Sequence, residues 1–289
     1  QDMKISELLK QDKVTLSFEV FPPKTSSSYE SVARATQEIA APRPDFMSVT
    51  YGAGGGTSEH TVNIAADLRK KYDVTVLTHL TCVSSTREHV AKMVQKYKEN
   101  GIENILALRG DIPEGGAPHS DYHYAAELVR DIKSQGDFCI GGACYPEGHV
   151  EAANKTEDIL HLKEKVEAGC EFLTTQMFFD NNLLYNFLYK IREAGITVPV
   201  VAGIMPITNA NQIDRALKLS GSHVPQRFKT LVDKFGSDPA AMKQAGIAYA
   251  TDQIIDLFAN NITNVHVYSM NKPDVAQKIQ ANLSDILGK

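Results

Sequence analysis

The chain has 289 residues, of which 43% are hydrophobic, and its formal net charge is −5 with a pI near 6.0. That is enough apolar material for one large α/β domain, and the lack of a basic stripe argues against a nucleic-acid partner. No apolar stretch approaches the ~20 residues that span a bilayer, and the start lacks the apolar segment of a signal peptide, so we expect no membrane partner. The four cysteines form no C-x-x-C pair, which is typical of reduced thiols in a cytoplasmic protein.

Short apolar runs alternate with helix-like segments from residue 15 onward. The run 15–20 precedes a helix predicted over 29–39, and the run 46–50 precedes a helix predicted over 59–72. The same order continues to the end of the chain. The remaining pairs are 74–80 with 86–100, 105–108 with 122–134, 139–145 with 157–168, 172–175 with 183–194, 198–202 with 211–219, and 265–268 with 275–287, and further helices are predicted over 225–235 and 240–260.

About eight strand–helix units either close into a barrel or form an open doubly wound sheet. Polar residues follow strands along the whole chain rather than at one switch point, which favours a (β/α)8 TIM-type barrel. The glycine-rich segment 52–56 is no dinucleotide fingerprint, because the third glycine would fall on Thr57. Without a linker or an internal repeat, we predict a single domain over residues 1–289, with an extra helical segment near 225–235.

Three polar side chains at predicted strands are candidates for chemistry. Glu19 lies inside the run 15–20, where burial would raise its pKa and suit a general acid at neutral pH. The alternative is a surface glutamate that points out of the barrel. Asp111 follows the run 105–108 and is placed either to bind N–H groups of a ligand or to cap its own loop. Gln176 follows another strand, and its amide offers both a donor and an acceptor to a heterocycle.

Two histidines and one helix face could bind a ligand. His79 and His149 are possible metal ligands, but no H-E-x-x-H motif is present and His149 lacks the P-C-x-x-C partner of zinc deaminases, so we predict no metal site. Asp158, His161 and Lys165 fall at i, i+3 and i+7 and therefore share one face of a helix. That face is either a salt-bridged surface or a face turned toward an anionic or hydroxylated ligand.

Six segments taken together carry a resemblance to a known family. They are S-F-E-V-F-P-P-K at 17–24, S-V-T-Y-G-A at 48–53, H-L-T-C at 79–82, A-L-R-G-D at 107–111, Y-P-E-G-H at 145–149 and T-Q-M-F-F-D at 175–180. In this order and near this spacing, they closely resemble methylenetetrahydrofolate reductase of the short bacterial type. The resemblance extends from about residue 17 to about residue 272.

The resemblance implies a fold and a reaction. The family is a (β/α)8 barrel that holds FAD without a Rossmann fold, and it reduces 5,10-methylenetetrahydrofolate to 5-methyltetrahydrofolate. NADH or NADPH supplies the hydride through FAD by ping-pong kinetics, and the product feeds methionine synthesis. A cytoplasmic homo-oligomer, dimer or tetramer, is expected. NADH is preferred to NADPH as the expected reductant, because the chain has the bacterial-type length.

The resemblance also implies residue roles. Glu19 would be the general acid that opens the imidazolidine ring of the folate to a 5-iminium ion, and Asp111 would hold the pterin and tune the flavin. Gln176, Gln212 and Lys272, with Glu19 and Asp111, would bind the substrates. The residues implied around FAD are Thr50, Tyr51, Ala53, His79, Arg109, Gly110, Asp111, Tyr124, Ala125, Tyr145, His149, Ala152, Asp158, His161 and Lys165.

The chain departs from the family pattern at several positions. His161 and Glu164 stand where some relatives carry Asn and Arg, so a positive charge near the expected pyrophosphate is missing and FAD is predicted to be held more loosely or differently. Lys272 stands where arginine is common, and it keeps the charge but loses the bidentate fork. Ala216 and its neighbours offer no aromatic ring to stack on the substrates. The chain ends after the barrel, so no regulatory domain and no inhibition by adenosylmethionine are expected.

Three other functions stay open at this point. Another barrel flavoenzyme, such as a relative of proline dehydrogenase, would use the same cofactor on a different substrate. A metal-dependent lyase would use His79 and His149. A binding module for flavin or folate would carry out no turnover.

Overall fold

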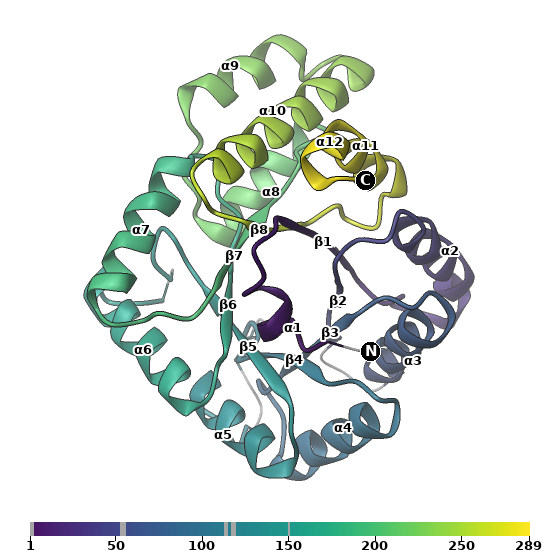
Figure 1. The fold of residues 1–289 in the computed structure, drawn as a ribbon, viewed down its shortest axis with the longest axis vertical. Helices are drawn as coiled ribbons and strands as arrows, with labels where there is room; N and C mark the ends of the chain where they lie inside the picture. The colour runs from purple at the N-terminus through teal and green to yellow at the C-terminus, as the bar shows by residue number, and fades with distance from the viewer. Residues whose placement is uncertain (1–2, 53–55, 113–114, 117–119, 150) are drawn as a thin grey trace.

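Eight parallel strands close into a barrel in the computed structural model of the chain (Figure 1). The structure describes residues 3–52, 56–112, 115–116, 120–149 and 151–289. Each strand pairs with its neighbours in sequence and β8 returns to β1, which confirms the predicted (β/α)8 TIM-type fold. The strands are β1 Thr15–Val20, β2 Met47–Val49, β3 Val76–Thr81, β4 Asn104–Leu108, β5 Cys139–Cys144, β6 Phe172–Thr175, β7 Val200–Ile204 and β8 Asn264–Val267.

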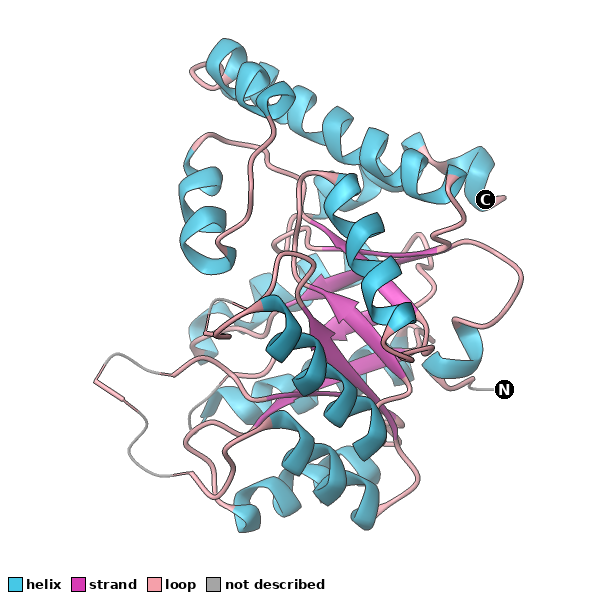
Figure 2. Ribbon diagram, turned by 90° about the vertical axis from the view of Figure 1, so that its left-hand side faces the viewer, coloured by secondary structure: helices cyan, strands magenta, loops and turns pink. Residues whose placement is uncertain are grey.

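Helices surround the central strands (Figure 2). The predicted extra segment near 225–235 is helix α9, which packs beside α10 outside the ring of barrel helices (Figure 1). In the described part of the chain, no helix is both long and apolar enough to cross a membrane. The helices are α1 Ile5–Leu8, the 3-10 turn η1 Ser26–Ser28, α2 Tyr29–Ala40, α3 Gly56–Lys71, α4 Arg87–Glu99, α5 Ala125–Gln135, α6 Lys155–Ala168, α7 Asn181–Glu193, α8 Asn211–Ser220, α9 Gln226–Phe235, α10 Pro239–Ala259, α11 Pro273–Asn282 and α12 Ser284–Leu287.

Some predicted elements differ from the observed ones at their ends. The helix predicted over 275–287 is divided into α11 and α12 at Leu283, which has φ −110° and ψ 8°. The strand predicted over 198–202 begins at Val200, because Pro199 has no N–H to donate to the sheet. Helix α1 was not predicted, since four residues are too few to show a helical period.

Alternation along β1 decides which side chains enter the barrel. The apolar residues of β1 belong to the cluster that packs against the surrounding helices, so the residues between them, Ser17 and Glu19, point inward. The strand register places Ser17 beside His266 of β8 and Glu19 beside Ser48 of β2. Barrel closure therefore brings four polar side chains together inside the barrel.

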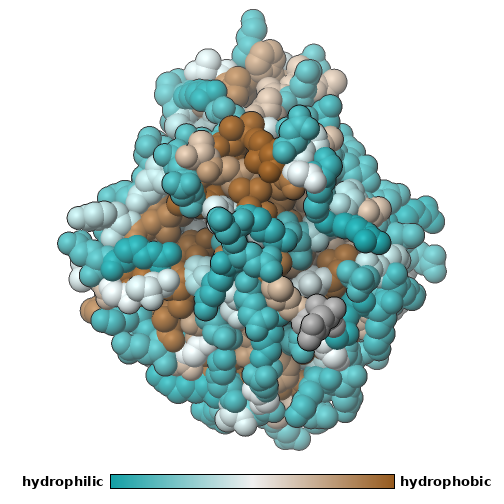
Figure 3. Space-filling model, viewed as in Figure 1, coloured by the Kyte–Doolittle hydropathy of each residue, from teal (hydrophilic) through white to brown (hydrophobic). Residues whose placement is uncertain are grey.

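Helix α1 closes the N-terminal end of the barrel below these polar side chains. The Ile5 N–H donates to Asn104 Oδ1 at 2.9 Å, and Asn264 Nδ2 donates to the Leu9 carbonyl at 3.3 Å. Figure 3, seen from the same side as Figure 1, shows hydrophilic side chains over the middle of this face. The apolar residues that fill the barrel with Ile5 and Leu9 are Phe46, Leu77, Leu106, Cys139, Phe172 and Val201.

Helix α10 approaches the segment after β7 most closely at Gly246. A Cβ at this position would overlap the backbone carbonyl of Ile207, and backbone cannot move aside as a flexible side chain does. We expect Gly246→Ala to lower the free energy of unfolding by about 2–3 kcal/mol, although alanine is the better helix former. Urea unfolding measures the change.

The matched control is Ala248→Gly, at an exposed position of the same helix. Its expected cost is about 1 kcal/mol, from helix propensity alone. If Gly246→Ala were as stable as the parent chain or more stable, the close contact between α10 and Ile207 would be wrong.

Candidate active site

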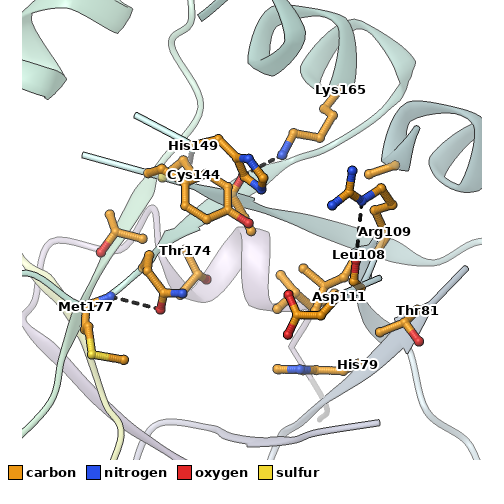
Figure 4. Close-up of a pocket in the computed structure, with 18 of the residues that line it drawn as sticks. His79, Thr81, Leu108, Arg109, Asp111, Cys144, His149, Lys165, Thr174 and Met177 are labelled. Atoms are coloured by element: carbon orange, nitrogen blue, oxygen red, sulfur yellow. Dashed lines mark hydrogen bonds between the residues drawn. The ribbon is translucent and has the colours of Figure 1, made fainter. Parts of the chain in front are cut away.

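A cavity of about 880 Å³ opens at the carboxyl ends of the strands (Figure 4). This is the end at which TIM-barrel enzymes carry their active sites. Most of the predicted site residues line it, although they come from segments spread over two thirds of the chain. They are Glu19, Thr50, Tyr51, His79, Arg109, Gly110, Asp111, Tyr124, Ala125, Tyr145, His149, Ala152, Asp158, His161, Lys165, Gln176 and Gln212.

Two predicted site residues remain, one outside the described residues and one away from the cavity. Ala53 lies outside the described residues. Lys272 precedes α11 and does not line the cavity; its Nζ donates to Thr208 Oγ1 at 3.4 Å. The same loop holds Gln212, whose Oε1 accepts from the Thr208 N–H at 2.7 Å. Lys272 therefore lies against the loop that positions Gln212, one layer behind the cavity.

Glu19 is enclosed by the barrel, and only 21% of its side chain is exposed. Its Oε1 accepts a hydrogen bond of 3.2 Å from Ser48 Oγ, and Ser48 Oγ lies 2.9 Å from His266 Nε2. His266 Nδ1 lies 2.6 Å from Ser17 Oγ. A chain of hydrogen bonds thus runs from Ser17 through His266 and Ser48 to Glu19.

Burial sets the charge of this interior. Desolvation raises the pKa of Glu19 to about 7, against the opposing effect of the hydrogen bond from Ser48. Desolvation also lowers the pKa of His79 to about 4 and that of His266 to about 3, where the nearby His79 adds to the effect. At neutral pH both imidazoles are neutral, while Glu19 can still hold and release a proton.

Two facts determine the donors and acceptors in this chain of hydrogen bonds: His266 is neutral, and Ser48 donates to Glu19. Ser48 Oγ then accepts from His266 Nε2–H, and His266 Nδ1 accepts from the Ser17 hydroxyl. In this arrangement Oε1 of Glu19 is an acceptor, so a proton on Glu19 is carried by Oε2. His79 Nε2 also lies 3.3 Å from Oε1, but it is not oriented for a hydrogen bond.

The segment after β4 brings Arg109, Gly110 and Asp111 to the cavity (Figure 4). Arg109 Nη2 lies 2.6 Å from Glu151 Oε2, and Arg109 Nε donates to the Gly110 carbonyl at 3.3 Å. Gly110 has φ 88°, and a Cβ there would come within 2.8 Å of Val83 Cγ1, so a glycine is required at this turn. The turn directs the exposed Asp111 to the rim of the cavity.

Helix α6 forms the adjoining wall, and Asn154 caps its start by accepting from the Glu157 N–H at 2.9 Å. Lys165 is held in the wall by a 2.6 Å hydrogen bond from Nζ to the Ala143 carbonyl (Figure 4). Burial lowers the pKa of Lys165 and raises that of Asp158. The predicted shared face of α6 is therefore turned toward the cavity, not toward solvent alone.

His149 presents a donor to the same space. Its Nδ1 accepts from the Glu151 N–H at 3.1 Å, so the neutral ring carries its proton on Nε2. Its ring packs edge-on against Tyr145, with ring centroids 4.5 Å apart. Gln176 differs, because its Oε1 accepts from the Met177 N–H at 3.1 Å, which leaves its amide nitrogen as the free donor.

Sequence reasoning missed several residues of the site. Ser48 and His266 complete the hydrogen bonds around Glu19, and Tyr268 donates from its hydroxyl to the Thr175 carbonyl at 2.7 Å. Arg215 lines the cavity one turn after Gln212. A signal was available for His266, which interrupts an apolar strand just as Glu19 does.

The residues present fit an elongated cofactor with a polar heterocycle, as a flavin has. The cavity volume lies near the upper end of the roughly 300–1,000 Å³ usual for ligand pockets. Three buried atoms at its wall, His79 Nε2, Thr81 Oγ1 and Thr174 Oγ1, have no hydrogen-bond partner among the described residues, which suits a ligand with its own donors and acceptors. Across the same described ranges, no three His, Cys, Asp or Glu side chains gather as a metal would require.

The raised pKa of Glu19 predicts a pH-dependent stability. The folded protein keeps this proton up to about pH 7, whereas the unfolded chain releases it near pH 4.5, so ionisation of Glu19 destabilises the fold as pH rises through that window. Glu19→Gln removes this cost. We expect the variant to be more stable than the parent chain by about 1–3 kcal/mol at pH 8, and by less at pH 5.

Thermal unfolding at both pH values, with exposed Glu38→Gln on α2 as the control, measures the difference. A stability difference between Glu19→Gln and the parent chain that stays the same at pH 5 and pH 8 would contradict the raised pKa. The comparison with the parent cancels the effect of the two buried histidines, which both chains share.

Comparison with known proteins identifies the family. The family model for methylenetetrahydrofolate reductase matches residues 4–284. The chain is 36% identical over 270 residues to the 5,10-methylenetetrahydrofolate reductase of Pectobacterium carotovorum subsp. carotovorum, covering 93% of this chain and 90% of that protein. It is 33% identical over 295 residues to methylenetetrahydrofolate reductase (NADH) 1 of Arabidopsis thaliana, covering 97% of this chain and 50% of the plant protein. The chain thus spans about half the length of the plant relative.

A solved structure shares the fold. It is a protein from Clostridium thermocellum described as binding two copies of 5-methyl-5,6,7,8-tetrahydrofolic acid; the TM-score is 0.68 at 12% identity, over 96% of this chain and 99% of that one. At this identity the likeness supports the barrel fold alone. The family model and the two reductases carry the assignment: the chain belongs to the methylenetetrahydrofolate reductase family and is an enzyme of that type.

Proposed function

We propose that this enzyme reduces 5,10-methylenetetrahydrofolate to 5-methyltetrahydrofolate with NAD(P)H, by ping-pong hydride transfer through FAD bound in the barrel cavity. When bound, FAD supplies a group that takes up a hydride from one substrate and passes it to the next. The observation that carries the proposal is Glu19, a buried acid with a pKa of about 7 at the floor of the cavity. The neutral imidazolidine ring of the folate needs such a proton donor in order to open.

Glu19 acts as the general acid. Its raised pKa keeps a proton available at neutral pH, and a positioned acid of this kind contributes about 10²–10⁴-fold to a rate. Because Ser48 donates to Oε1, Oε2 is the oxygen that delivers the proton to a nitrogen of the imidazolidine ring. Ring opening then yields the 5-iminium ion that accepts the hydride.

The cofactor is held by the residues that the family resemblance assigns to FAD and that line the cavity. Donors come from His149, Arg109 and the Lys165 ammonium, and acceptors come from Asp158 and the Thr50 hydroxyl. Lys165 would meet the phosphates as a point charge, since its hydrogen bond to the Ala143 carbonyl uses only one of its three protons.

Asp111 and Gln176 hold the pterin from opposite sides of the cavity. The Asp111 carboxylate accepts the N–H groups of the pterin, and it tunes the flavin by its charge. The Gln176 amide nitrogen, left free by the bond of its oxygen to Met177, donates to the heterocycle. Gln212 lies on the side of the cavity that receives the glutamate tail of the folate, and Lys272 lies behind it.

Further properties follow from the same proposal. NADH is the reductant, as in the name of the Arabidopsis relative, and the product feeds methionine synthesis. Residues 1–289 act as a single catalytic domain in a dimer or tetramer. The four cysteines are buried and unpaired, which agrees with a reducing cytoplasm.

An anaerobic spectral titration tests the proposal. The purified protein with FAD should show flavin bands that bleach on addition of NADH and return on addition of methylenetetrahydrofolate. Bands that bleach and stay bleached would leave a flavoenzyme with another substrate. Protein that binds no FAD would overturn the cofactor assignment.

Glu19→Gln separates the two half-reactions. The amide keeps the shape of the side chain but has no acid proton, so we expect folate reduction to fall about 10²–10⁴-fold. NADH oxidation with an artificial electron acceptor should stay within about twofold of the parent rate, because that half-reaction needs no acid at Glu19. Stopped-flow measurement of each half-reaction, with Glu38→Gln as control, provides the comparison. Loss of FAD binding in Glu19→Gln would show that Glu19 has a structural role instead.

A further inference from the structure

Glu147 belongs to the Y-P-E-G-H segment at 145–149 but has no part in the cavity wall. Tyr145 and His149 line the cavity on either side of it, whereas Glu147 does not. The Gly148 N–H donates to the Tyr145 carbonyl at 3.0 Å, and Gly148 has φ 87°, so the chain makes a tight turn here. The turn therefore places Glu147 between two cavity residues and leaves its carboxylate for a contact outside the cavity.

The Glu147 carboxylate joins this turn to the segment between α8 and α9. Its Oε1 accepts from the His223 N–H at 2.6 Å, across 76 residues of sequence. A carboxylate makes a stronger hydrogen bond to a backbone N–H than a neutral acceptor does. Ser222 adds a second contact, because its Oγ donates to the Met177 carbonyl at 3.2 Å. The loops after β5 and β6 thus both hold the segment that follows α8.

Helix α8 forms part of the cavity wall but has little apolar contact to hold it there. Gln212, Arg215 and Ala216 line the cavity. Of the α8 side chains that the structure describes, only Ala216 is buried. The start of the helix is fixed by Gln212, whose Oε1 accepts from the Thr208 N–H at 2.7 Å. The position of its other end therefore depends on the segment to which Glu147 is bound.

We propose that Glu147 is a positioning residue for the folate: by accepting from the backbone after α8, it holds this helix against the cavity and keeps Gln212 within reach of the substrate. Loss of the Glu147 carboxyl group loosens the wall that meets the folate. The acid that carries out the chemistry, Glu19, lies on β1 and stays in place. This inference rests on the proposed function, which assigns Gln212 to the folate.

Stopped-flow reoxidation of the reduced flavin at increasing methylenetetrahydrofolate concentration tests this role. Glu147→Ala removes the acceptor, so we expect the apparent dissociation constant of the folate to rise about three- to tenfold, as for the loss of one hydrogen bond. The limiting rate of reoxidation and the dissociation constant of FAD should stay within about twofold of the parent values, because only binding of the folate is affected.

Two further variants sharpen the comparison. Glu147→Gln keeps an oxygen that can accept from the same N–H, so it should restore most of the affinity for the folate that Glu147→Ala loses. Glu167→Ala is the matched control, since Glu167 is exposed on α6 and does not line the cavity. Its affinity for the folate should equal that of the parent.

Trypsin cleavage reports on α8 without any turnover. Arg215 and Lys218 of this helix are exposed, and a helix whose end is released opens more often. We expect cleavage after Lys218 to be about three- to tenfold faster in Glu147→Ala than in the parent or in Glu167→Ala, because cleavage follows the population of the open form. Mass spectrometry identifies the cleaved bond.

Three results would overturn the positioning role. The first is an affinity for the folate in Glu147→Ala equal to that of Glu167→Ala. The second is an equal loss in Glu147→Gln, because charge and not the hydrogen bond would then be responsible. The third is a matching loss of FAD affinity, because the disturbance would then lie in the turn that carries His149. If the parent chain reduces no folate, the proposed function fails, and the trypsin comparison still decides whether Glu147 holds α8.

Discussion

Closure of the barrel is the constraint on which the active site depends. Strands β1 and β8 lie some 250 residues apart in sequence, and their pairing sets Ser17 beside His266. Only that pairing lets His266 reach Ser48, which in turn reaches Glu19. An open sheet with the same strands would leave Glu19 on an edge in water, where its pKa would have no reason to rise.

The same burial acts on every titratable group of the interior, and the effects agree. It favours the uncharged forms of Glu19, His79 and His266, so the barrel interior at neutral pH holds almost no net charge. The free-energy cost of burying an ionised side chain is therefore avoided. Of these three groups, only Glu19 has a pKa close to neutral pH. The charged groups lie farther out, at the rim and along α6.

Local sequence patterns were enough to predict the fold and several residues of the candidate site. The barrel followed from alternating strands and helices, and Glu19 and Asp111 were found because each stands out from an apolar strand. The contacts of Glu19 could not be predicted, because Ser48 and His266 reach it only through the register of distant strands. Gln212 was assigned by resemblance, but sequence could not show that its oxygen folds back onto the Thr208 loop.

Helix α1 determines the end of the barrel from which molecules can reach the cavity. Ile5 and Leu9 fill the N-terminal end of the barrel with apolar side chains, so molecules enter the cavity from the carboxyl ends of the strands. Under the proposed function, the dinucleotide and the folate would both reach Glu19 through this same opening, so one would have to leave before the other could bind.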